Sequence, residues 1–251
     1  MSNTLQHQPL IILTHPHNEK DVLKKGLIKS GLEVMTDVMI ETDPIALSDA
    51  EMKVIFGCRR IILTSKRGVE YLFTQLRPAE ILDKSFICIG KKTALALEQK
   101  GIKPWWVSYG KTASDLVKEL KHVRFQKSEK WIALLGALAE DTLEQGLSEL
   151  CDFQRINIYQ TTLIEHASAE TIEHLQKQDE VLVVCTSPSC FHGYLSNYNH
   201  YMHPGVRFAS IGPVTTQAML DKGIQPLIEA TRSTYEGLLL ALKSKLTPIY
   251  H

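Results

Sequence analysis

An internal repeat constrains the fold of this chain more than any other feature of its sequence. Residues 89–93 (IGKKT) correspond to residues 211–215 (IGPVT), and residues 100–104 correspond to residues 222–226, at one spacing (211 − 89 = 122). The same spacing relates Thr64-Ser65 to Thr186-Ser187, and Thr112, Leu116 and Leu120 to Thr234, Leu238 and Leu242. So many matches at one spacing predict two homologous lobes.

Short apolar strands alternate with amphipathic helices along the chain. Residues 10–13 (LIIL) are all apolar, as in a strand that is covered on both faces. Strands are expected at 10–13, 34–42, 60–65, 85–90, 104–108, 131–135, 154–164, 181–186, 207–211 and 225–229, and helices at 18–29, 45–53, 68–75, 91–100, 114–121, 141–150, 169–176, 213–222, 234–245 and after Pro188. This alternation predicts an α/β fold with parallel sheets and helices on both faces.

Two extended segments are candidates for connectors between the lobes. Residues 154–164 (QRINIYQTTLI) alternate apolar and polar side chains and are longer than one small sheet needs. The segment near Val38 holds the equivalent place in the other repeat. If both segments cross, residues 1–37 and 163–251 form one discontinuous lobe, residues 42–158 form the other, and residues 38–41 and 159–162 connect them. A simple tandem arrangement fits the repeat as well.

Composition limits the classes of function. The 251 residues carry 28 basic and 28 acidic side chains. No basic excess indicates nucleic acid, and an anionic ligand would have to be held by local donors. The five cysteines include no C-x-x-C and favour buried reduced thiols over a disulfide framework. Because the apolar run at 10–13 is too short for a signal peptide or a membrane span, we expect a soluble cytoplasmic protein.

Hydroxyl and glycine residues stand where predicted strands lead into helices. Thr64 and Ser65 end one strand, Ser187 precedes Pro188 in the manner of an N-cap, and Gly212 begins the next helix. Such turns leave free N–H groups at the carboxyl edge of a parallel sheet, where open α/β folds bind ligands. Each turn taken alone is better explained as a helix cap. Because both lobes repeat the pattern, we interpret the turns as a facing pair of anion-binding rims.

Three further side chains are candidates for a site. Thr93 and Thr215 lie in the first turn of their helices, where each hydroxyl would either reach a cleft or bond back to its own helix. Tyr159 would act as a phenolic proton donor. A tyrosine in a strand often only packs, but the place of Tyr159 on a connector favours a functional role.

The histidines do not indicate a metal site. His192, His200 and His203 fall in or near a polar loop, and no acidic or cysteine ligand completes a set. His15 and His17 flank a proline in the first strand-to-helix turn, where they would line the cleft or be solvated. The chain has no G-x-G-x-x-G, no P-loop and no G-x-S-x-G, so nucleotide-binding and serine-hydrolase functions have no support.

Several segments resemble the uroporphyrinogen-III synthase family. The segment at residues 158–161 (IYQT) is similar to the family's V-Y-x-T strand. Residues 183–189 (VVCTSPS), 209–216 (ASIGPVTT), 222–224 (KGI) and 233–238 (STYEGL) are similar to its C-terminal signature, and residues 63–69 (LTSKRGV) and 89–94 (IGKKTA) are similar to its first-lobe equivalents. The likeness covers nearly the whole chain.

The resemblance implies two Rossmann-like lobes joined by a two-stranded β connector. It also implies cofactor-free cyclisation of the linear tetrapyrrole hydroxymethylbilane, with inversion of ring D and loss of water, in haem biosynthesis. Tyr159 matches the family's tyrosine that assists departure of the hydroxyl. Thr93 and Thr215 match the family's threonine positions, and Ser187 matches its cleft serine. The substrate-binding residues expected in all are Thr64, Ser65, Gly90, Thr93, Gly136, Ser187, Ser189, Gly212 and Thr215.

The implied chemistry suits these residues. The substrate is a polycarboxylate, which backbone N–H groups at helix starts would bind. Its pyrrole nitrogen expels the hydroxide to give an azafulvene, so the protein mainly positions the chain for ring closure, with modest acid assistance. The expected partner is this substrate, with a transient hand-over from hydroxymethylbilane synthase. We expect a monomer with no cofactor, metal, nucleic acid or membrane.

Two turns depart from the family's pattern. Gly136 is followed by residues 137–140 (ALAE) where basic residues are frequent, and His15-Pro16 stands where Arg-Pro is frequent. Carboxylate contacts at these turns are therefore expected to be weaker. Two alternatives stay open: a non-catalytic two-lobed module that binds a small anion, and a family relative without activity.

Overall fold

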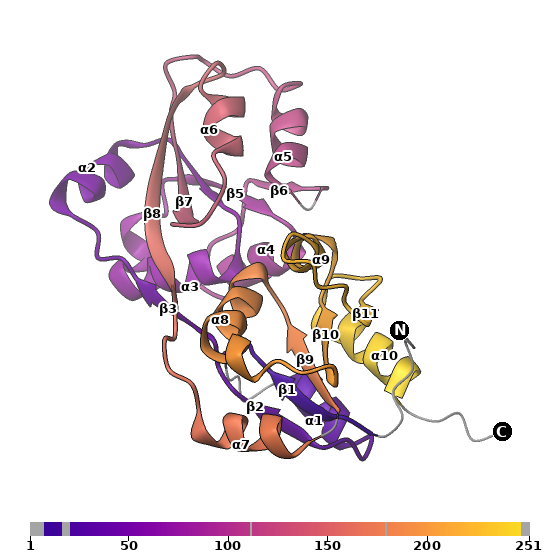
Figure 1. Ribbon diagram of the computed structural model, residues 1–251. Helices are drawn as coiled ribbons and strands as arrows, with labels where there is room; N and C mark the ends of the chain where they lie inside the picture. The colour runs from indigo at the N-terminus through magenta and orange to yellow at the C-terminus, as the bar shows by residue number, and fades with distance from the viewer. Residues whose placement is uncertain (1–7, 17–20, 111, 179, 247–251) are drawn as a thin grey trace. The chain divides into compact units, whose positions relative to one another are not determined.

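The computed structural model describes residues 8–16, 21–110, 112–178 and 180–246. The chain forms two compact units: unit 1 comprises Met1–Glu41 and Thr162–His251, and unit 2 comprises Thr42–Thr161 (Figure 1). The polypeptide passes from one unit to the other within two strands, β3 (Ile40–Pro44) and β8 (Asp152–Leu163). These strands are neighbours in one sheet.

Unit 1 contains a five-stranded parallel sheet in the order β11-β10-β9-β1-β2. Its strands are β1 (Leu10–Leu13), β2 (Val34–Thr36), β9 (Val181–Cys185), β10 (Val206–Ser210) and β11 (Ile228–Glu229). One face packs on α1 (Val22–Ile28) and α10 (Tyr235–Leu246). The other face packs on α7 (Ala169–Lys177), α8 (Pro188–Tyr198) and α9 (Pro213–Leu220), with the short η2 (Asn199–Tyr201) after α8. Because helices cover both faces of the sheet, every residue of β1 and β9 is buried, and all of these residues are apolar.

Unit 2 contains a six-stranded sheet in the order β3-β8-β7-β4-β5-β6. Its remaining strands are β4 (Arg60–Leu63), β5 (Ser85–Ile89), β6 (Trp106–Ser108) and β7 (Lys130–Gly136), and the pairs from β8 to β6 are parallel. One face packs on α2 (Asp49–Gly57), α3 (Lys66–Gln75) and α4 (Lys91–Glu98), and the other on α5 (Ala113–Leu120) and α6 (Thr142–Leu147). The short η1 (Pro78–Glu80) follows α3.

The repeat in the sequence is a repeat in topology. The order β2-β1-β9-β10-β11 in unit 1 corresponds, strand for strand, to β8-β7-β4-β5-β6 in unit 2. In each unit the strand order reverses at a central pair of neighbouring strands. This pair is β1 and β9 in unit 1, and β7 and β4 in unit 2. The predicted α/β class, with parallel sheets and helices on both faces, is confirmed.

One predicted helix begins at the wrong residue. Residues 45–53 were expected to be helical, but α2 spans Asp49–Gly57. Ser48 Oγ accepts the N–H of Glu51 at 3.3 Å, and Glu51 Oε2 accepts the N–H of Ser48 at 2.9 Å. This capping box starts the helix four residues later than the apolar pattern suggests. Ile45 instead donates its N–H to the carbonyl of Ile158 at 3.0 Å, which ties residue 45 to β8.

Across the described ranges, every helix falls short of the length and apolarity that crossing a bilayer requires.

Candidate active site

Three of the predicted site residues meet at the carboxyl edge of the unit 2 sheet. The direction of strand order reverses between β7 and β4, and open α/β sheets bind ligands outside the carboxyl ends of their strands at such a point. β7 ends at Gly136, and Ser65 lies two residues beyond the end of β4. Tyr159 of β8 lies against Gly136 and its hydroxyl contacts Ser65.

Tyr159 is partly buried, with its hydroxyl toward Ser65 and its ring against Tyr71. Tyr159 Oη lies 3.3 Å from Ser65 Oγ, and the two tyrosine rings stack with centroids 5.4 Å apart at 27°. Ser65 Oγ also accepts the N–H of Gly68 at 3.0 Å, so Ser65 is the N-cap of α3. One serine therefore connects the start of a helix to the phenol.

A β-bulge sets the direction of the Tyr159 side chain. Leu135 of β7 faces Asn157, but the next residue, Gly136, faces Tyr159, so Ile158 is an extra residue in β8. Without the bulge, Tyr159 would share the face of Asn157, because strand side chains alternate. With it, Tyr159 packs on the same core cluster as Ile158, on the face that α3 covers. Bulges beside functional sites redirect side chains in this way.

Residue 136 has room only for glycine. A Cβ added there would lie 2.6 Å from Cε2 and Cζ of Tyr159 and 2.8 Å from its Oη. These distances are shorter than the van der Waals contact of real carbon atoms. The next residue, Ala137, donates its N–H to the carbonyl of Tyr159 at 2.9 Å. The Tyr159 side chain therefore packs directly on the turn that follows β7.

Thr64 lines a pocket at the same edge of unit 2. The pocket has a volume of about 200 Å³, and its walls include Ile89, Leu135, Glu140 and Thr142. The pocket offers mostly apolar walls with a few polar groups, the composition typical of small-molecule sites.

In each unit one helix at the carboxyl edge begins at a glycine. Gly90 begins α4 at φ 77°, a left-handed conformation that glycine adopts readily. Gly212 begins α9, and an added Cβ there would lie 2.2 Å from Ser233 Oγ. Neither glycine carries a side chain to cap its helix, so first-turn N–H groups of α4 remain for an anion. In α9 this leaves the N–H of Val214, because Pro213 has none and that of Thr215 bonds the Gly212 carbonyl at 3.1 Å. Thr93 and Thr215, in these first turns, are 4% and 2% exposed.

Ser187 begins α8 as predicted. Its Oγ accepts the N–H of Cys190 at 3.2 Å, and Pro188 occupies the first helical position. The predicted N-cap is confirmed. Ser189, in the first turn of α8, is partly buried.

His15 is not the solvated turn residue that was one of the two expectations for it. It is 1% exposed, and its Nε2 lies 2.8 Å from Oδ2 of Asp21, which is 4% exposed. Asp21 Oδ1 also accepts the N–H of Lys24 at 3.0 Å and so caps α1. The expectation of a solvated turn residue is wrong because this pair buries the imidazole, whose ring lies 5.0 Å from that of Tyr235. The other histidine of the turn, His17, lies outside the described residues.

Neither a metal centre nor a reactive thiol is found in the described ranges. No group of three or more His, Cys, Asp or Glu side chains there is placed to hold a metal ion. All five cysteines are free and buried, as predicted. Burial raises the pKa of the Cys58 thiol to about 11 and that of Cys88 to about 12. These two thiols therefore stay protonated, and unreactive, at neutral pH.

One protein family matches most of the chain. The family model described as uroporphyrinogen-III synthase HemD matches residues 21–239. The porphyrin biosynthesis protein HemD of Ruminiclostridium josui is 24% identical over 250 residues, an alignment that covers 91% of this chain and 47% of that protein. The chain thus spans about half the length of the curated relative it matches.

Two solved structures are similar to the whole chain. Uroporphyrinogen-III synthetase from Helicobacter pylori has a TM-score of 0.66 and 18% identity, covering 94% of this chain and 99% of that one. A mutant uroporphyrinogen III synthase from Thermus thermophilus has a TM-score of 0.62 and 17% identity, covering 95% and 98%. At this identity the likeness concerns the fold, while the family model spans most of the sequence. The chain belongs to the uroporphyrinogen-III synthase family.

Proposed function

We propose that this protein catalyses the cyclisation of hydroxymethylbilane to uroporphyrinogen III, with inversion of ring D and loss of water, as a step of haem biosynthesis. Membership of the family supports this activity. The observation that carries the proposal is the contact of Tyr159 with Ser65 and Gly136 at the switch point of unit 2. There a phenolic proton donor lies at the N-cap of α3, at the carboxyl edge of the sheet.

The arrangement supports a role for Tyr159 as the acid. Ser65 Oγ already accepts the Gly68 N–H, so its own proton is free to point at Tyr159 Oη. The phenolic proton is then available to the hydroxyl that leaves the substrate. The C–O bond breaks as the pyrrole nitrogen supplies the electron pair, and the hydroxyl departs as water. The azafulvene carbon then bonds to the substituted carbon of ring D and gives a spiro intermediate. The bond from that carbon to its original methylene bridge breaks, and the freed methylene bonds to the unsubstituted α carbon of ring D. That carbon loses its proton, which replaces the one that Tyr159 donated.

Binding of the carboxylates is proposed for the carboxyl edge of each unit. In unit 2 the candidates are Thr64, Ser65, Gly90, Thr93 and Gly136. In unit 1 they are Ser187, Ser189, Gly212 and Thr215. The helix starts at Gly90 and Gly212 support this assignment best, because they present backbone donors without a side-chain cap.

The cellular setting is part of the proposal. We place the protein in the cytoplasm, as a monomer that receives its short-lived substrate from hydroxymethylbilane synthase. Residues 1–37 with 163–251, and residues 42–158, would act as two lobes joined through residues 38–41 and 159–162.

The direct test is to supply hydroxymethylbilane and to separate the type III from the type I isomer of the product. Type I forms without an enzyme, so the expected result is type III in excess at a rate proportional to protein concentration. Type I alone would refute the activity.

A further inference from the structure

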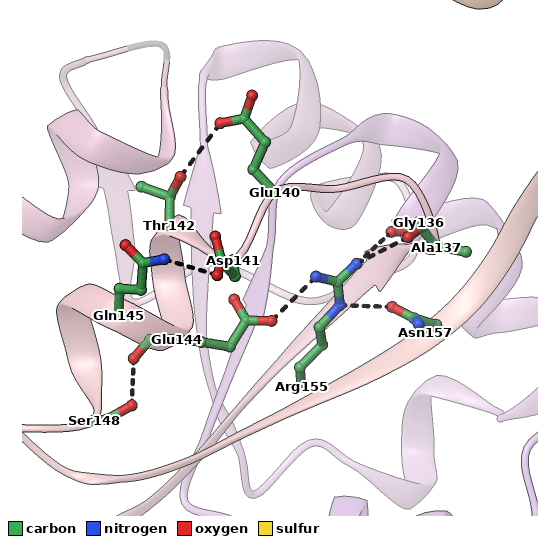
Figure 2. Close-up of polar contacts among 10 residues, drawn as sticks. All are labelled: Gly136, Ala137, Glu140, Asp141, Thr142, Glu144, Gln145, Ser148, Arg155 and Asn157. Atoms are coloured by element: carbon green, nitrogen blue, oxygen red, sulfur yellow. Dashed lines mark hydrogen bonds and ion pairs between the residues drawn. The ribbon is translucent and has the colours of Figure 1, made fainter.

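Arg155 of β8 lies next to the turn that follows β7. Figure 2 shows its guanidinium among polar groups of that turn and of α6. Nη2 donates to the carbonyl of Gly136 at 3.0 Å and to that of Ala137 at 3.2 Å. Nη1 donates to Glu144 Oε1 at 3.1 Å, and Nε donates to Asn157 Oδ1 at 2.7 Å. Four of the five guanidinium N–H groups are thus used within unit 2.

The two carbonyls belong to the turn that carries Tyr159. Gly136 O also accepts the N–H of Ala139 at 3.0 Å, which closes a tight turn. On its other side the turn touches Tyr159, through the Ala137 N–H and through the bare Cα of Gly136. Arg155 therefore binds the carbonyl of the Gly136–Ala137 peptide, whose N–H bonds Tyr159, and the carbonyl of the next peptide in the turn.

The position of Arg155 in the strand strengthens this link. Asn157, which accepts from Arg155, is the last residue of β8 in regular register before the bulge. The guanidinium thus binds Asn157, which lies next to the bulge in β8, and also the Gly136–Ala137 turn, which lies opposite the bulge at the end of β7. Both ends of the irregular pairing that redirects Tyr159 are tied to one rigid planar group.

The surroundings of Arg155 make a simple replacement difficult. Its side chain is 19% exposed and that of Glu144 is 27% exposed, so the pair is partly shielded from water. The second carboxylate oxygen of Glu144, Oε2, is buried and has no hydrogen-bond partner among the described residues. Without the guanidinium, Glu144 would be a poorly solvated charge beside two unpaired carbonyls.

We propose that Arg155 is a positioning residue for the cyclisation: it holds the Gly136–Ala137 turn and the bulge in the geometry that places the Tyr159 hydroxyl. This inference rests on the proposed function for its catalytic consequence. Its structural part, the dependence of the turn on Arg155, is independent of the reaction.

The test compares Arg155→Met with Arg60→Met. Arg60 is a matched control, because it is a 12%-exposed arginine of the same unit in an ion pair with Glu129 at 3.1 Å. It lies at the start of β4, at the opposite end of the sheet, and stacks over Trp105 with its Cζ 4.2 Å from the ring centroid. Met fills both sites without charge.

Arg155→Met is expected to lower kcat about 10- to 100-fold with a smaller change in KM, since a misplacement of about 1 Å has effects of this size. Arg155→Lys should recover only part of kcat, because one ammonium does not bridge two carbonyls, a carboxylate and an amide. Arg60→Met should leave kcat unchanged. In hydrogen exchange, the Ala137 amide should exchange faster in Arg155→Met alone. If Arg155→Met does not fold, Arg155→Lys replaces it in both measurements.

Equal kcat in Arg155→Met and wild type, or equal effects of the two Met variants on kcat, would overturn the positioning role. Unchanged exchange of the Ala137 amide would overturn its structural basis. If wild-type protein forms no type III product, the proposed activity fails instead. The exchange comparison then still decides whether Arg155 holds the turn.

Discussion

Tyr159 in unit 2 and Asp37 in unit 1 occupy equivalent places in the repeat (159 − 37 = 122), but their side chains make different contacts. Tyr159 has a partly buried phenol that meets Ser65. Asp37 accepts hydrogen bonds from Tyr198 and from Thr171, the latter at 2.6 Å, and so ties β2 to α7 and α8. Burial, and then the bond to Asp37, raise the pKa of the Tyr198 phenol to about 12. Unit 1 thus uses this place for packing, while unit 2 presents a proton donor.

The same divergence affects the neighbouring places. The counterpart of Gly136 is Thr14, which is buried and donates to the carbonyl of Val184 at 2.8 Å. In strand register the counterpart of Arg155 is Val34, because Ile11 pairs with Val34 as Ala133 pairs with Arg155, and Val34 is a partly buried apolar residue. The two units therefore share strand order and helix starts, but the glycine, the tyrosine and the arginine clamp occur in unit 2. A shared fold does not imply a shared site, and the following variants test this contrast.

Gly136→Ala should have the largest effect. The new Cβ would overlap the Tyr159 ring at 2.6 Å, so the ring must move, and kcat should fall about 100-fold. Steady-state formation of type III product is the measurement. Gly212→Ala in unit 1 meets only Ser233, whose Oγ can rotate away, so its loss should be smaller. Gly57→Ala, where no described atom lies within 4 Å of the new Cβ, is the control. A larger loss in Gly212→Ala would reverse the contrast between the units.

Tyr159→Phe should lower kcat by about 10- to 100-fold, because it removes acid assistance but leaves the pyrrole nitrogen to expel the hydroxide. The ring and its stacking on Tyr71 are kept, so stability should change little. Tyr71→Phe is the matched control: it keeps the stacked ring and loses only the bonds from its hydroxyl to Thr42. Wild-type kcat in Tyr159→Phe would remove Tyr159 from the mechanism.

Asp37→Ala should act on stability instead of catalysis. It leaves the hydroxyls of Tyr198 and Thr171 without their acceptor, so the free energy of unfolding should fall by about 1.5–3 kcal/mol, as for a hydrogen bond to a charged group. Urea denaturation measures this loss, and Asp37→Asn, which keeps one acceptor oxygen, should lose less. A reduced kcat with unaltered stability would show that unit 1 contributes chemistry at this place.

Much of the fold was predictable because it depends on local patterns. The apolar run at residues 10–13 and the alternation of strands and helices predicted parallel sheets, and Ser187 before Pro188 predicted the start of α8. The start of α2 was also present in the sequence, as the S-x-x-E pattern of Ser48 and Glu51, but the apolar periodicity obscured it.

The candidate site was less predictable. Tyr159, Ser65 and Gly136 were each selected from the sequence, but the regular alternation of β8 places Tyr159 on the wrong face of the sheet. The burial of His15 was missed because its partner, Asp21, was not considered as a side chain that both caps α1 and receives an imidazole.

The sequence by itself determined the α/β class, the twofold repeat and the residues at which most helices begin, since periodicity and caps act over a few neighbouring residues. Only the tertiary structure decided that an extra residue in β8 turns Tyr159 toward Ser65, 94 positions away, and that Asp37 meets Tyr198, 161 positions away. Arg155 likewise reaches the Gly136 carbonyl across 19 positions. Such contacts depend on register and on the packing of distant segments, which no local pattern specifies.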